Sequence, residues 1–130
     1  MMANATPGNA RYIALTTYRR DGRPVTTPVW SAPLGGKIYV VTGASTGKAR
    51  RLRATSRVRF AACNASGRRI LGDWREGTGR IVQDEARRSE ALAALKRKYG
   101  WQLSLSMAIY RLRGLYQERV VLELTPSSEI

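Results

Sequence analysis

The chain has 130 residues, 43% of them hydrophobic, and its 23 lysines and arginines outnumber 9 acidic residues for a net charge of +14. It has no histidine and one cysteine, which excludes histidine-based catalytic triads, the common zinc sites and an internal disulfide. The charge favours an acidic partner, such as phosphate, nucleic acid, anionic lipid or a polycarboxylate, without choosing among them.

The length and the even spread of apolar clusters predict one domain over residues 11–130. Residues 1–10 are small and polar, with Pro7 and Gly8, and predict an irregular N-terminal arm. No apolar run approaches the roughly 20 residues of a membrane span, and the N-terminus lacks the apolar core of a signal peptide. We therefore expect a cytoplasmic protein with no membrane span.

Three strands are predicted in the first third of the chain. Residues 11–18 are rich in β-branched and aromatic types, and RRDG at 19–22 indicates a hairpin turn. The second strand, 23–32, contains Pro24 and Pro28, which lack an amide donor and so favour an edge or bulged strand. After the turn PLGG, residues 37–42 predict a third strand, and the three are expected to form a meander.

The stretch VTGASTGKARRLRATSRVRF begins like a phosphate-binding loop. Three residues rather than four separate Gly43 from Gly47, and Ala49 follows Lys48 where a Ser or Thr would hold Mg²⁺, so the stretch is not a nucleoside-triphosphate loop. Small residues before a cation at a helix start still suit an anion. The helix is expected over residues 46–55, with Ser45 or Thr46 as its N-cap and Leu52 facing inward.

The rest of the chain predicts three more strands, at 58–64, 77–82 and 119–124, with Cys63 as a small buried packing residue. A helix capped by Asp84 is expected to run to Tyr99 and end at Gly100, and a second helical piece is expected over 102–112. Six strands with short turns in so small a chain favour a closed or half-closed antiparallel barrel.

Three stretches, YIALTTYRRDGRPVTTPVW, KIYVVTGASTGKARRLRATSRVRFAACNASG and GTGRIV, resemble the split β-barrel superfamily of pyridoxamine-phosphate-oxidase-like flavoproteins. The likeness is greatest to its actinobacterial branch that uses the deazaflavin coenzyme F420. The resemblance implies a mainly β fold with flanking helices, a split antiparallel β-barrel, and a homodimer with cofactor grooves between the subunits. It also implies the cofactor-binding residues: Ser45, Thr46, Lys48 and Arg51 at the phosphate, and Thr27, Pro28, Val29 and Trp30 at the ring.

Coenzyme F420 carries a phosphodiester and a tail of glutamates, so it requires several cations beyond one phosphate contact. Lys48, Arg50, Arg51 and Arg53 would supply them, with Arg57 in addition; the alternative is a solvated basic helix face. Because flavin mononucleotide (FMN) presents a phosphate to the same loop, it is the alternative cofactor. We expect Lys48 and Arg51 to lie on the helix surface, where their replacement hardly changes stability. Four aromatic residues would line a substrate cavity or serve as core and dimer contacts: Trp30, Trp74, Trp101 and Tyr110.

The function implied is hydride transfer between the bound deazaflavin and an unidentified small molecule, with orientation and electrostatics supplied by the protein. No catalytic side chain is named; a proton would come from water, Tyr110 or Tyr116. One alternative is a protein that binds the coenzyme without turnover, and another is an FMN-dependent enzyme of the same fold. A nucleic-acid-binding module is disfavoured because no recognised motif is present, so no specific nucleic-acid partner is expected.

Overall fold

The structure, a computed structural model, describes residues 6–43, 46–103, 105 and 119–127. Its labelled elements follow the order β1 (Tyr12–Tyr18), β2 (Pro24–Val29), β3 (Ala32–Leu34), β4 (Lys37–Gly43), α1 (Gly47–Ala54), β5 (Arg57–Cys63), β6 (Arg75–Ile81), α2 (Glu85–Tyr99) and β7 (Arg119–Pro126).

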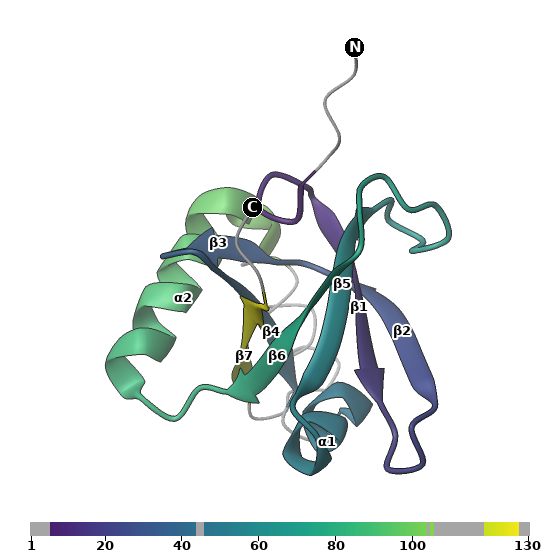
Figure 1. The fold of residues 1–130 in the computed structure, drawn as a ribbon. Coiled ribbons are helices and arrows are strands. Elements are labelled where there is room, and N and C mark those ends of the chain that lie inside the picture. The colour runs from purple at the N-terminus through teal and green to yellow at the C-terminus, as the bar shows by residue number, and fades with distance from the viewer. Residues whose placement is uncertain (1–5, 44–45, 104, 106–118, 128–130) are drawn as a thin grey trace.

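The strands form one antiparallel sheet with the order β2-β1-β5-β6-β7-β4-β3, which curls into a half-barrel (Figure 1). Its inner face holds the main core, with Ile13 and Leu15 from β1, Phe60 from β5 and Leu122 from β7 all fully buried. Helix α1 closes one end of the half-barrel, and its Leu52 joins this core as expected. The mainly β, half-closed antiparallel architecture is therefore confirmed.

Helix α2 covers the outer face of β3 and β4, where Ala91, Ala94, Leu95 and Tyr99 are buried (Figure 1). Its bounds agree with the expected helix. The Asp84 side chain accepts a hydrogen bond from the Ala86 amide at 3.1 Å, which is the predicted N-cap. Of the second helical piece, Trp101–Leu103 and Leu105 are helical, and residues 106–112 lie outside the described residues.

The expected meander is wrong, because β4 pairs with β7 and β3 rather than with β2. The single strand expected over 23–32 is divided at Trp30 and Ser31, so that β2 pairs with β1 at one edge of the sheet and β3 pairs with β4 at the other. Tyr99 of α2 fixes the break. Its hydroxyl accepts from the Ser31 amide at 2.9 Å, and its ring stacks on Trp30 with centroids 4.4 Å apart.

The outer face of β7 carries one buried carboxylate, Glu123, which is only 3% exposed. It accepts hydrogen bonds from the Tyr39 hydroxyl at 2.7 Å and from Arg80 Nε at 2.8 Å, and Lys37 Nζ lies 3.4 Å away. Burial alone would raise the pKa of Glu123, but these donors outweigh it, so the pKa lies below the ordinary 4.5.

This shift predicts acid sensitivity. A depressed carboxyl pKa adds stability that is complete above the unfolded-state pKa and is lost as pH falls through the folded-state pKa. Unfolding by urea should therefore become easier as pH drops below about 4.5. The same titration of Glu123→Gln should show a less stable protein at neutral pH and a smaller decline in acid. An equal decline in both proteins would assign the acid sensitivity to other groups.

Candidate functional site

The predicted anion-binding segment lies at the start of α1. Thr46 is the N-cap; its hydroxyl accepts from the Ala49 amide at 3.4 Å and donates to the Gly43 carbonyl at 3.0 Å. The alternative cap, Ser45, lies outside the described residues. The first turn contains no acidic residue and carries Lys48 instead. Because a helix N-terminus is partly positive, a cation there is unfavourable until an anion approaches.

Arg51 lies over this N-terminus rather than pointing into solvent. Its Nε donates to Thr17 Oγ1 of β1 at 2.5 Å, and its Nη1 would lie 2.6 Å from a Cβ at Gly47. Only glycine at position 47 leaves room for the guanidinium group in this place. This hydrogen bond favours a larger contribution of Arg51 to stability than the sequence suggested, because Thr17 is fully buried and its hydroxyl would lose this partner.

Burial and neighbouring cations lower the pKa of two cations at α1. Burial lowers the pKa of Lys48, and Arg51 lowers it further. Burial also lowers the pKa of Arg51, with added effects from Arg19 and Arg50. No ion pair joins Lys48 or Arg51 to a carboxylate in the part of the chain that the structure describes. The arrangement thus gathers positive charge with no counter-ion of its own, which is what an anion-binding site requires.

Further arginines surround a second space beside this site. A cavity of about 570 Å³ lies between the β1–β2 turn and the end of α1. We call it the arginine cavity; it is lined by Tyr18, Arg19, Arg20, Gly22, Arg53, Ala54, Thr55 and Arg57. The Cζ atom of Arg57 lies 4.2 Å from the centroid of the Tyr18 ring. This cation–π contact holds one of the arginines of the cavity in place. Arg19 connects the two places, because it lines the cavity and acts electrostatically on Arg51.

The residues predicted at the cofactor ring lie farther along the same hairpin. Strand β2 is an edge strand, as its prolines predicted, and Thr27, Pro28 and Val29 pair with Leu15, Ala14 and Ile13 of β1. From Thr17 to the level of Ile13 the hairpin extends about 13 Å, at roughly 3.3 Å per residue. A ligand that contacts both Arg51 and the predicted ring residues would therefore lie along β1 and β2. The Thr27 hydroxyl is buried and has no hydrogen-bond partner among the described residues.

The aromatic candidates are placed apart from one another. Trp30 packs against Tyr99 of α2, which gives it a structural contact, and its role at the ring stays a prediction. Trp74 lies under Arg59 of β5, whose Cζ is 4.4 Å from the ring centroid, and Trp101 is 72% exposed. Tyr110 and Tyr116 lie outside the described residues.

Sequence reasoning missed Thr17 and Arg19, which contribute to the site from β1 and the turn that follows it. Thr17 meets Arg51 across 34 positions of sequence, and no local pattern reveals such a contact. Within the described ranges no group of acidic, histidine or cysteine side chains could hold a metal ion. The helices in the same ranges include none long and apolar enough to cross a membrane.

Comparisons with known proteins identify the family and the fold. Residues 4–128 match the family model described as pyridoxamine 5′-phosphate oxidase. A conserved hypothetical protein from Mycobacterium tuberculosis is similar in structure, with a TM-score of 0.67 and 22% identity over 92% of this chain and 75% of that one. The heme storage protein HutZ of Vibrio cholerae is also similar, with a TM-score of 0.67 and 14% identity over 93% of this chain and 84% of that one.

A third similar structure is an FAD-binding protein from Mesorhizobium loti, with a TM-score of 0.58 and 16% identity over 91% of this chain and 80% of that one. Among curated proteins, none matches the sequence. At these identities the likeness to solved structures extends to the fold alone.

Proposed function

Because the chain belongs to the pyridoxamine 5′-phosphate oxidase family, we propose that it is an oxidoreductase that binds a flavin-type cofactor along the β1–β2 hairpin, with the cofactor phosphate at α1. One observation carries the proposal. Arg51 is held over Gly47 at the N-terminus of α1 by Thr17, beside Lys48, with no carboxylate paired to either cation among the described residues. Such a cluster is stabilised by an anion at the helix start.

The cofactor we propose is the deazaflavin coenzyme F420. One phosphate uses Lys48, Arg51 and the amides of the first turn, and this leaves the arginine cavity for further negative charge. The glutamate tail of F420 provides that charge next to its phosphodiester, whereas FMN ends at its phosphate. Thr27, Pro28 and Val29 would lie along the ring, and the edge of β2 that does not pair with β1 offers backbone groups to it.

The bound coenzyme supplies hydride transfer to or from a small molecule, and the protein supplies its orientation. Arg51 and Lys48 would hold the phosphate of the cofactor, and the ring residues, which lie roughly 7–13 Å farther along the hairpin, would hold its ring. A site that holds the cofactor at both its phosphate and its ring limits the orientations of the ring and thereby the directions from which a substrate can approach it.

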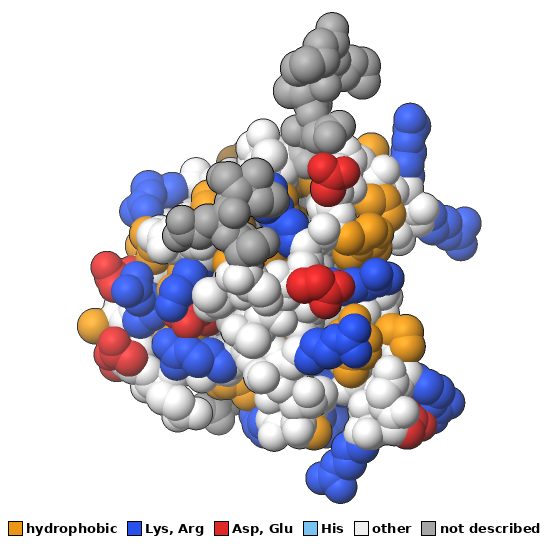
Figure 2. All heavy atoms as spheres, viewed as in Figure 1, with side chains coloured by type: hydrophobic (Ala, Val, Ile, Leu, Met, Phe, Trp, Pro, Cys, Tyr) orange, Lys and Arg blue, Asp and Glu red, His pale blue; other side chains and the backbone are white. Residues whose placement is uncertain are grey.

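A nucleic-acid groove is not favoured by the face of the molecule shown in Figure 2. Figure 2 shows lysine and arginine side chains spread over this face with acidic side chains among them, and no continuous basic stripe. Cations are grouped more closely at the start of α1 and around the arginine cavity. This distribution favours a compact anionic ligand over a long polyanion.

The test is spectral titration with oxidised F420 and with FMN. We expect tighter binding of F420, and weaker binding as its glutamate tail is shortened, with the tail effect greater at low salt. Tighter binding of FMN would replace the proposed coenzyme with an ordinary flavin. If F420 binds, oxidation of the reduced form in the presence of electrophilic acceptors distinguishes an enzyme from a protein that only holds the coenzyme.

We also propose that the protein is a homodimer. The connection between β5 and β6 exposes three large apolar side chains, Ile70, Leu71 and Trp74, at 36–42% of their surface. Exposed apolar side chains that lie close together mark an interface more often than bulk surface. Light scattering should give twice the chain mass. A monomer that binds F420 tightly would contradict a site shared between subunits.

A further inference from the structure

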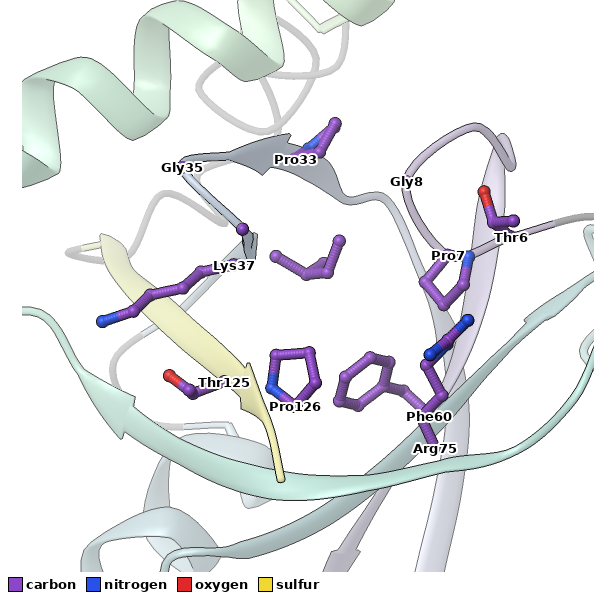
Figure 3. Close-up of a pocket in the computed structure, with 12 residues that line it drawn as sticks. Thr6, Pro7, Gly8, Pro33, Gly35, Lys37, Phe60, Arg75, Thr125 and Pro126 are labelled. Atoms are coloured by element: carbon purple, nitrogen blue, oxygen red, sulfur yellow. The ribbon is translucent and has the colours of Figure 1, made fainter. Parts of the chain in front are cut away.

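A second cavity, of about 600 Å³, lies at the mouth of the half-barrel. We call it the mouth cavity; it is lined by Thr6, Pro7, Gly8, Pro33, Gly35, Gly36, Lys37, Ile38, Phe60, Arg75, Thr125 and Pro126 (Figure 3). It lies at the start of β4, whereas α1 follows the end of that strand, so the barrel separates this cavity from the α1 site. Its volume is typical of small-molecule sites, which run from about 300 to 1,000 Å³.

The walls of the mouth cavity are mainly apolar. Its deep side reaches Ile38 and Phe60, two members of the buried core, and prolines approach from three separate segments. Figure 3 shows Pro7, Pro33 and Pro126 around the space, with the Phe60 ring beside Pro126. Rings of proline and phenylalanine change shape little, so a ligand with an apolar body would find this surface already formed.

One cation enters this apolar space. Arg75 begins β6 opposite Phe60, and its side chain extends from the strand towards Pro7 (Figure 3). Its neighbour Glu76 belongs to the opposite face by strand alternation, and the next two residues on the inner face are Gly77 and Gly79. The Arg75 side chain makes no hydrogen bond or ion pair with any other described residue. Because the charge of Arg75 is not paired within the described residues, a bound anion could form charge-assisted hydrogen bonds with it.

The second cation on the lining is already paired. Lys37 extends away from the space in Figure 3, and its Nζ lies 3.4 Å from Glu123 on the outer face of the sheet. The mouth cavity therefore offers one cation rather than two, so its charge complements a monoanion better than a phosphate dianion or a dicarboxylate.

We propose that the mouth cavity binds a small monocarboxylate with an apolar body, whose carboxylate contacts Arg75 and whose body lies against Pro7, Ile38, Phe60 and Pro126. This site is separate from the cofactor site at α1 and does not depend on the function proposed above. A planar guanidinium holds a carboxylate through two parallel hydrogen bonds, and the apolar walls contribute through burial of the ligand.

The test uses octanoate and octan-1-ol as probes, titrated into the whole chain by calorimetry, because the two differ in charge but hardly in apolar length. We expect Arg75→Gln to weaken octanoate binding about tenfold and to change octanol binding by less than about twofold. Arg97→Gln in α2 is the matched control, since it removes the same charge from an exposed position outside the cavity. Equal losses in the two variants would show that net charge alone attracts the probe and would overturn the proposal.

A second variant tests the location independently of charge. Pro33→Phe places a larger side chain at the rim of the mouth cavity from the edge strand β3. This variant should bind both octanoate and octanol more weakly, while its affinity for F420 at α1 should stay unchanged. If a folded Pro33→Phe protein binds both probes as the unsubstituted chain does, the ligand lies elsewhere and the proposal fails.

Discussion

Replacing Lys48 or Arg51 with alanine is expected to weaken the binding of oxidised F420 about ten- to a hundredfold. Each removes a charge-assisted hydrogen bond to the phosphodiester, worth roughly 1.5–3 kcal/mol. The two variants should differ in stability. Lys48→Ala should unfold at nearly the same urea concentration as the unsubstituted chain, whereas Arg51→Ala should lose about 1–3 kcal/mol because the buried Thr17 hydroxyl loses its partner.

Two further variants separate a built site from attraction by net charge. Arg97→Ala removes one exposed cation of α2, and its affinity for F420 should stay within about twofold of the unsubstituted value. Thr17→Val keeps every charge but removes the hydroxyl that holds Arg51 in place, so it should weaken F420 binding several-fold. A loss in Arg97→Ala equal to that in Lys48→Ala would mean that the +14 charge, and not the geometry at α1, attracts the coenzyme.

The sequence could predict the parts of this fold that depend on neighbouring residues. The hairpin at RRDG, the caps at Thr46 and Asp84 and the edge position of β2 each follow from a few adjacent residues, and the structure confirms them. The family resemblance is confirmed by the match over residues 4–128, while the F420 branch stays a proposal.

The pairing of the strands could not be predicted in this way. Strand β4 pairs with β7, about 80 residues later in the chain, and α2 packs on the outer face of both. The hydrophobic pattern of KIYVVT is equally compatible with a neighbour from the same meander. The break at Trp30 and Ser31 also depends on a distant group, the Tyr99 hydroxyl.

For the candidate site, too, the sequence predicted the features set by adjacent residues but not those set by distant ones. The glycines and cations at the start of α1 are adjacent in sequence and suggested an anion on their own. The direction of Arg51 was not predictable, because it is set by Thr17 from another strand and by the absence of a side chain at Gly47. Arg75 was not predicted as a binding residue, because a lone arginine before Glu76 is typical of an exposed strand end. Only the curl of the sheet turns it inward.

Gly77→Ala should be the most destabilising single-methyl change in the half-barrel. A Cβ at Gly77 would lie 2.4 Å from the Thr125 carbonyl oxygen and 3.3 Å from the Phe60 ring. The first of these is a backbone atom of the paired strand β7, which cannot move aside as a flexible side chain could. The β6–β7 pair would have to separate, so we expect a loss of about 3 kcal/mol or more and a fall in melting temperature of roughly 10 °C.

The matched control for this prediction is Gly8→Ala, the same substitution at the rim of the mouth cavity. There the added Cβ would have Pro33 as its nearest neighbour at 3.5 Å, an ordinary van der Waals contact, so we expect stability within about 0.5 kcal/mol of the unsubstituted chain. The stability of both variants can be measured by thermal unfolding, with circular dichroism as the signal. Equal stability of the two variants would show that β6 and β7 have room for a methyl group between them at Gly77, and it would contradict the close approach of the two strands there.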